Sequence, residues 1–534
     1  MVTLFLQGSR TSSETCQAFP RAKMEVSTTI FLLKRRKTMT GNLILSRFQT
    51  FGSQFQALFR SQTSSRPDLH EFWLHPERLP KSAAQMPVVK RILDLLGPLD
   101  WKHFPERNLQ RHWVQPAVSY ASFAGAMLVK LNEGLDSMGD LRQYLVEHCV
   151  LIPLLGYPVV RSNRHPSNFD PDASLPTQRH LTRMLREMPN SNLQYLLNDT
   201  VRLIREELRQ HQVEIGECIS LDTKHILAWV KENNPKAYLE QRFDNTKQPS
   251  GDPDCKLGCK RRHNQKKKQP LGQDPIPTPT TNPKPGEGIK FGEFYWGYGS
   301  GVVVCKVPGW GEMVLAELTQ TFDKADVSYF FPLMTVMEQR LGFRPRFATF
   351  DAGFDAWYVH AYFHREDDPT AFAAVPFSEK GGYKAKGRQF SPDGLPLCAA
   401  ELPMPLQYIY TDRTTCLVAH ERGKYVCPLR YPQHTDQSCP ANHKNWNKQG
   451  CTVMMPTSIG ARLRYTLDRD SQLYKDIYKQ RTATERINSQ AKALGIERPH
   501  IRNGKAIANL NTLIYILINL RLLQRIRNHQ PETD

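Results

Sequence analysis

The sequence lacks the features that mark membrane and secreted proteins. No uninterrupted apolar run reaches the roughly 18 residues that a membrane-spanning helix requires. The most apolar stretch, residues 510–523, is interrupted by Asn511 and Asn519, and this pattern predicts a buried core helix. The N-terminal segment does not match a secretion signal, because its short apolar part at 29–33 precedes the basic residues 34–37. We therefore expect a cytoplasmic protein.

Acidic residues are in short supply. The 534 residues include 71 Lys and Arg but only 52 Asp and Glu, which gives a formal charge of +19 and an isoelectric point near 9.4. This excess of positive charge favours a polyanionic partner, and nucleic acid is the one we expect. The 11 cysteines are odd in number and scattered, which predicts free thiols or bound metal in a reducing compartment rather than disulfides.

Length and periodicity divide the chain. A chain of this length is too long for one small core, so about two to four domains are expected. Residues 1–65 have little periodicity and are predicted to be a disordered extension, whereas residues 66–210 are predicted to be a helical, basic, DNA-binding domain. Within it, Thr177 can cap a short helix that turns Leu181 inward and Arg183 outward, and a longer helix follows. A helix-turn-helix and an ordinary helical bundle both fit this pattern.

Residues 215–378 change to strand-like alternation. The predicted order is three strands, a helix, a strand, a helix and a strand. This order is typical of an α/β fold in which an antiparallel meander continues into parallel crossovers, with helices packed on a mixed sheet. Asp222 interrupts the apolar pattern of the first strand. Asp351 ends a later strand, and Gly353 allows the sharp turn that exposes its carboxylate at the strand tip.

Two insertions interrupt this region. Residues 232–292 carry a basic run that includes Lys260, Arg261 and Arg262, followed by a proline-rich part. This composition predicts a flexible segment whose charge follows a phosphate backbone. Residues 379–465 form the second insertion, which is rich in proline and cysteine.

Cysteine spacing suggests zinc in both insertions. Cys255, Cys259 and His263 recur every four residues and could bind zinc from one face of a helix. The second insertion offers four candidates for a closed zinc knuckle: Cys398, Cys427, Cys439 and Cys451. They do not form the closely spaced pairs of ordinary zinc fingers, so separate buried thiols are the alternative.

A polar stretch near the C-terminus completes the set of candidate residues. Four polar residues share one helical arc of about 60° at 100° per residue: Tyr478, Arg481, Glu485 and Lys492. Four apolar residues fall on the opposite side: Ala483, Ile487, Ala491 and Leu494. A carboxylate flanked by cations suits a metal-bound phosphodiester, because the acid can bind Mg²⁺ while the cations hold phosphates. A solvated face with charge pairs one turn apart is the alternative.

These residues together resemble a known family. The spacing Tyr-x2-Arg-x3-Glu-x6-Lys at 478–492, with Asp222 and Asp351 upstream, resembles the DDE transposases of the insertion-sequence four group, which carry this YREK signature. The resemblance covers roughly residues 215–525. It implies an RNase H-like catalytic core that is interrupted by the two insertions and completed by residues 466–528. The implied activity is metal-dependent DNA cleavage at the ends of a mobile element and strand transfer into target DNA, with hairpin ends as one route.

The resemblance also implies a metal site. Asp222, Asp351 and Glu485 would hold two Mg²⁺ or Mn²⁺ ions, one activating a water or a 3′-hydroxyl and the other stabilising the leaving oxygen. Asp355, four residues after Asp351, is the alternative if Asp351 is not the ligand.

The implied partner is double-stranded DNA, both the terminal inverted repeats of the element and the target. Tyr478, Arg481 and Lys492 would hold phosphates beside the scissile bond, and Trp446 is a candidate for stacking on an unpaired base. A homodimer on DNA, associated with the nucleoid of a prokaryotic cell, is expected. Two other functions stay open. One is a DNA-binding derivative without catalysis, and the other is a structure-specific nuclease without strand transfer.

Overall fold

The computed structural model describes residues 66–528 with gaps at 68, 110–117, 165–167, 235, 238, 261–292, 379–387, 414–416 and 436. All of the described residues belong to one compact unit, Ser61–Asp534. The predicted N-terminal extension and Arg261, Arg262 and His263 lie outside the described residues.

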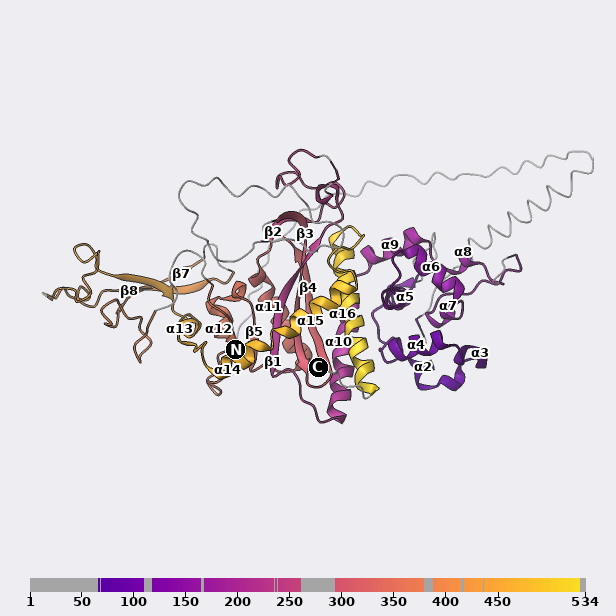
Figure 1. Ribbon diagram of the computed structural model, residues 1–534, viewed down its shortest axis with the longest axis horizontal. Helices are drawn as coiled ribbons and strands as arrows, with labels where there is room; N and C mark the ends of the chain where they lie inside the picture. The colour runs from indigo at the N-terminus through magenta and orange to yellow at the C-terminus, as the bar shows by residue number, and fades with distance from the viewer. Residues whose placement is uncertain are drawn as a thin grey trace, which may run out of the picture. The chain divides into compact units, whose positions relative to one another are not determined.

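The largest sheet is mixed and has six strands (Figure 1). Its antiparallel strands are β1 (Cys218–Leu227), β2 (Lys256–Lys260), β3 (Glu293–Val307) and β4 (Gly311–Thr321). Its parallel strands, which continue from β1, are β5 (Phe347–Thr349) and β6 (Phe372–Ala374). The order β4-β3-β1-β5-β6 confirms the predicted meander followed by parallel crossovers, and β2 pairs with the first residues of β3.

Helices connect and cover these strands. The crossovers are the short turn η4 (Asp326–Tyr329), α11 (Phe330–Leu341) and α12 (Trp357–Phe363). The side chains predicted to face inward from α11 are buried: Phe330, Leu333, Met334 and Met337. The sheet strands are apolar along most of their length because helices cover them, so β1, β3 and β4 bury successive residues rather than every second one.

The C-terminal helix α16 (Gly504–Arg527) is the predicted core helix. It is long and apolar enough to cross a membrane, yet 83% of its most apolar window is buried inside the protein. It contacts β4 and α10 (Asn190–Gln210). Asn519, which interrupts its apolar pattern, accepts a hydrogen bond from the Val314 amide at 2.8 Å and donates one to the Val314 carbonyl at 2.9 Å. The asparagine therefore satisfies the β4 backbone beside an irregularity in the β3–β4 register.

The N-terminal residues are helical, as predicted. The helices are α2 (Leu69–Leu74), η1 (Pro76–Arg78), α3 (Lys81–Ala84), α4 (Pro87–Leu96), α5 (Tyr120–Asn132), α6 (Met138–Glu147), α7 (Leu151–Leu154), α8 (Pro171–Ser174) and α9 (Gln178–Glu187), followed by α10. They share one continuous hydrophobic core with the sheet, which extends from Leu69 to Ile526.

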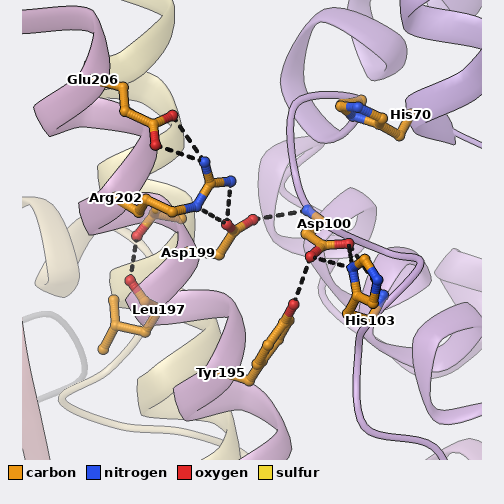
Figure 2. Close-up of polar contacts among 10 residues, drawn as sticks. His70, Asp100, His103, Tyr195, Leu197, Asp199, Arg202 and Glu206 are labelled. Carbon is orange, nitrogen blue, oxygen red and sulfur yellow. Dashed lines mark hydrogen bonds and ion pairs between the residues drawn. The ribbon is translucent and has the colours of Figure 1, made fainter.

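Polar contacts fasten this helical region to α10 (Figure 2). Asp199 of α10 accepts hydrogen bonds from the Asp100 amide at 2.7 Å and from Arg202 at 2.6 Å. Tyr195, one turn earlier, donates to the Asp100 carboxylate at 2.8 Å. Burial would raise the pKa of Asp100, but the hydrogen bonds from Tyr195 and His103 lower it overall. The loop after α4 is thus held to α10 by charged and neutral hydrogen bonds together.

The turn-linked pair α9 and α10 forms where it was predicted. The Thr177 side chain accepts a hydrogen bond from the His180 amide, and Leu181 is buried. Because α10 packs against α16 and β4, its apolar face is committed to the core. Arg179 and Arg186 leave an exposed basic face on α9.

The second insertion contains a separate antiparallel sheet. Its strands are β7 (Leu406–Asp412), β8 (His420–Val426) and β9 (Thr452–Pro456), and α13 (Ile459–Thr466) follows. Contact between α13 and α12 returns the chain to the larger sheet. Next come α14 (Gln472–Lys479) and α15 (Thr482–Ala493).

The predicted helical zinc motif in the first insertion is wrong. Cys259 lies within β2, and Cys255 immediately precedes it. Four residues of strand extend about 13 Å, which is too far for two thiolates to share one ion. Strand pairing with β3 has replaced the helix on which that prediction depended.

Candidate active site

Asp222 and Asp351 are brought together by strand register. β1 and β5 pair in parallel, with Ser220 opposite Thr349. Asp222 lies two residues further along β1, and Asp351 lies two residues beyond the end of β5, close enough for its charge to act on Asp222. Neighbouring strands lie about 4.8 Å apart, and paired residues of parallel strands face the same side of the sheet. The two predicted acids therefore belong to one site.

The surroundings of this pair disfavour the charged form of Asp222. Burial, and next the charge of Asp351, raise the pKa of Asp222 to about 7, while a hydrogen bond from the Thr223 amide and the charge of Arg481 oppose the shift. A divalent cation between the carboxylates would remove their repulsion. The donors are all carboxylate oxygens, the type that Mg²⁺ and Mn²⁺ prefer, so the residues present fit such an ion.

A fourth acid, which sequence reasoning missed, lies beside this pair. Asp326 of η4 accepts a hydrogen bond from the Thr223 hydroxyl at 2.7 Å. A Cβ on Gly353 would stand 2.8 Å from Asp351 Oδ1 and 3.1 Å from Asp326 Oδ2. Only glycine leaves the space between these two carboxylates open. Nothing in the spacing around Asp326 distinguishes it from an ordinary acid at a helix start.

The predicted single helix around Glu485 is two helices. α14 ends at Lys479 and α15 begins at Thr482, with two residues of αR conformation between them. The hydroxyls of Thr482 and Thr484 donate to the carbonyls three residues earlier, at 3.0 and 2.8 Å. Such hydroxyl contacts compete with the helical ladder, which explains the break.

α15 nevertheless presents the predicted faces. Ala483, Ile487 and Ala491 are buried. The Thr484 and Ser220 hydroxyls lie 3.2 Å apart and join α15 to β1. Asn488, one turn after Glu485, donates to Asp222 at 3.2 Å. Sequence reasoning missed Asn488, although it falls on the same helical arc as Glu485.

Glu485 pairs with a cation instead of joining the two aspartates. Its carboxylate lies 2.5 Å from Arg481 and is 54% exposed. Tyr478 lies within electrostatic reach of both groups and of both aspartates. Burial raises the pKa of its hydroxyl, the charge of Arg481 opposes this shift, and the three carboxylates add to it. Among the residues that the structure describes, no three acidic, histidine or cysteine side chains are placed to hold a metal ion as they stand.

The remaining predicted DNA contacts lie apart from this group. Lys492 pairs with Glu497 at 3.3 Å, and Lys224 approaches the same carboxylate at 3.9 Å. Lys260 ends β2, where the described part of the polybasic run stops. Trp446 lies in the β8–β9 loop under Arg430, whose guanidinium is 4.7 Å from the ring centroid.

Asp355, the alternative to Asp351, has a structural role. Its carboxylate, which is fully buried, accepts two hydrogen bonds from Arg464 at 2.8 and 2.6 Å and one from the Ser378 amide at 2.8 Å. Burial alone would raise the pKa of Asp355, but hydrogen bonds from His360 and Arg464 hold it well below the usual range. With its oxygens committed to α13, Asp355 joins the insertion to the sheet.

A cavity of about 530 Å³ lies between the sheet and the insertion. Arg388 and Arg422 line it together with the rings of Trp357 and Tyr465, and none of the three predicted acids does. Its lining therefore combines guanidinium groups with aromatic rings, the two kinds of side chain that contact phosphates and bases in nucleic-acid-binding proteins.

Comparison of the chain with known protein families, with curated proteins and with solved structures found no match.

Proposed function

We propose that the protein is a DDE transposase that cleaves DNA at the ends of a mobile element and joins those ends to target DNA. The observation that carries this proposal is the proximity of Asp222 on β1 and Asp351 just after β5, two strands that pair in parallel, with α15 packed on β1. Separate segments of the chain thus supply the three acids and the YREK residues Tyr478 and Arg481 to one neighbourhood.

The sheet topology supports an RNase H-like core. The antiparallel strands β1, β3 and β4 are followed by the parallel strands β5 and β6, with Asp222 in the middle of β1 and Asp351 just after the end of β5. This is the arrangement that the resemblance implies for DDE enzymes.

The proposed chemistry needs only groups already near the site. Mg²⁺ or Mn²⁺, held by Asp222 and Asp351, would supply Lewis-acid catalysis of phosphodiester attack. Arg481 holds Glu485 in the protein without DNA. A phosphate that binds Arg481 competes for the same guanidinium, so DNA binding would release Glu485 toward the aspartates.

The proposed substrate is double-stranded DNA. The charge of +19, the exposed arginines of α9 and the arginine-lined cavity all favour a polyanion. We propose that α9 and the polybasic run track the duplex while the insertion handles its end, and that two copies act on two ends.

Cleavage of DNA carrying the cognate terminal repeat, with Mg²⁺ or Mn²⁺, tests the proposal. Wild type should nick the end and join it to target DNA, whereas D222N and D351N should bind but not cleave. D94N, which changes an exposed acid on α4, is the matched control and should retain activity. Cleavage without joining would indicate a nuclease. DNA binding without metal-dependent cleavage would indicate a non-catalytic derivative. Near-native cleavage by D351N would overturn the site assignment.

A further inference from the structure

The second insertion has little hydrophobic core of its own. Four buried residues form its separate cluster: Met404, Tyr425, Met455 and Ala461. The main core, by comparison, is continuous through the sheet and the N-terminal helices. Small units with so few buried apolar side chains commonly depend on a disulfide or a metal for stability.

Two cysteines meet where the strands of this insertion end. Val426 of β8 pairs with Thr452 of β9, so Cys427 and Cys451 are the next pair in register. Residues so paired have Cα atoms about 4.5–5.5 Å apart. Their thiols lie close enough to interact with each other.

Gly450 shows how closely the loop follows this pair. Its φ is +72°, and a Cβ there would stand 2.7 Å from Cys427 Cβ and 3.3 Å from its sulfur. A left-handed glycine is therefore required for the chain to pass over Cys427 on its way into β9.

A third thiol approaches from a different segment. Cys398 lies near enough to interact electrostatically with Cys451, and both pack against the small cluster around Met404. The Ala400 amide donates to the Cys398 sulfur at 3.4 Å. Hydrogen bonds from outside the ligand set commonly orient the groups that bind a metal.

Cys439 lies on the loop that joins the first two cysteines. Its carbonyl accepts from the Asn442 amide at 3.0 Å, which forms a turn. Arg430 donates to the Lys448 carbonyl at 2.8 Å and so draws the two sides of the loop together. Cys439 is thus carried by a loop that begins at Cys427 and ends at Cys451.

We propose that Cys398, Cys427, Cys439 and Cys451 bind one structural Zn²⁺ ion, which fastens the β8–β9 loop and the segment before β7 to each other. Four thiolates in tetrahedral geometry are a closed structural site, and each thiol releases its proton to solvent on binding. Since no three such side chains in the described residues enclose an ion as they stand, binding would draw Cys439 inward. This inference is independent of the proposed catalytic function.

Metal analysis of the full-length protein tests it. Protein purified with Zn²⁺ and dialysed extensively against zinc-free buffer should retain about one zinc per chain. C398S, C427S, C439S and C451S should each lose that zinc, whereas C149S, which changes an exposed cysteine in the N-terminal helices, should keep it. A mercurial that modifies thiols should release the zinc of wild type into a colorimetric chelator, a readout that does not depend on how the variants fold.

Three results would overturn the proposal. Wild type without zinc and with all thiols titratable would show separate buried cysteines. A Cys427–Cys451 disulfide, found by mass spectrometry of protein purified without reductant, would show that a covalent bond fastens the strands. Zinc retained in C439S would show that Cys439 is not a ligand of the ion.

Discussion

At the scale of single residues, the site depends on unlike environments for three carboxylates. Asp222 is partly buried and opposed by Asp351, whereas Glu485 is exposed and paired with Arg481. Repulsion between Asp222 and Asp351 is tolerated because Thr223 and Asn488 donate hydrogen bonds to Asp222. The pair stores an unfavourable interaction that a cation would relieve.

The stability of the protein should therefore depend on the ionisation of Asp222. Its pKa is raised to about 7, whereas an unfolded aspartate titrates near 3.9. Between these two values the folded chain keeps a proton that the unfolded chain loses. Ionisation of Asp222 therefore lowers the unfolding free energy progressively as pH rises from about 4 to 7, and the full loss is reached above about pH 7. In metal-free buffer, D222N should match wild type at pH 4 and exceed its unfolding free energy by about 2–4 kcal/mol at pH 8.

Urea unfolding at the two pH values measures this difference. Mg²⁺ at pH 8 should reduce the difference in unfolding free energy between D222N and wild type, because the cation stabilises only wild type. The same gap at pH 4 and pH 8 would show that Asp222 is not destabilised by its charge.

The Arg481–Glu485 pair separates stability from function. Exposed ion pairs contribute about 0–1 kcal/mol, so E485Q should change the unfolding free energy by less than about 1 kcal/mol while abolishing cleavage. R481A should weaken binding of end DNA and reduce its salt slope by about one unit, as expected for one lost phosphate contact.

K479A is the matched control for R481A, since Lys479 is an exposed α14 cation paired with Asp476 at 2.9 Å. The affinities of wild type, R481A and K479A for end DNA, measured over a range of salt concentrations, give the slopes to be compared. Identical salt slopes for R481A and wild type would show that Arg481 does not contact DNA phosphates.

At the scale of elements, local polar contacts decide where helices end and how they dock. Threonine hydroxyls divide α14 from α15. On α16, Asn519 docks the helix on β4, and Asn509 donates to the Leu185 and Met188 carbonyls at the end of α9, both at 2.8 Å. The asparagines in an otherwise apolar helix therefore set its register against its neighbours.

Loss of Asn519 tests this role. N519A would leave the Val314 amide and carbonyl buried without their side-chain partner, at a cost of about 2–4 kcal/mol. N528A, at the exposed end of α16, should cost less than about 0.5 kcal/mol. Chemical unfolding of both variants measures the difference, and equal small losses would show that water replaces the amide.

At the scale of the whole molecule, α16 joins regions that are far apart in the sequence. It contacts α10, α9, α5 and β4, so the N-terminal helices and the sheet share one core through it. The two acids on the sheet and the basic face of α9 are therefore parts of one compact unit.

A chain that ends at Gly504 should not fold. Removing α16 would expose the apolar faces of α10 and β4, a loss far larger than the usual net stability of about 5–15 kcal/mol. A chain that ends at Asn528 retains α16 and is the control. Circular dichroism during heating should show a cooperative transition for the control alone. Cooperative unfolding of the shorter chain would show that the N-terminal helices and the sheet fold without α16.

The sequence by itself determined the elements and most of the candidate residues. Strand and helix periodicities predicted β1, β3, β4 and α16 within a few residues, because they depend on spacing along the chain. The same spacing identified Asp222, Asp351 and the residues from Tyr478 to Glu485. It could not identify Asp326, whose role depends on Gly353 and Thr223 meeting it from other segments.

Tertiary structure alone decided which of these residues meet. Parallel pairing of β1 with β5 brought Asp222 near Asp351, and packing of α13 paired Asp355 with Arg464. Pairing with β3 made β2 a strand and separated Cys255 from Cys259, whereas pairing of β8 with β9 brought Cys427 to Cys451. Each outcome depends on long-range hydrogen bonds and packing, which local spacing does not encode.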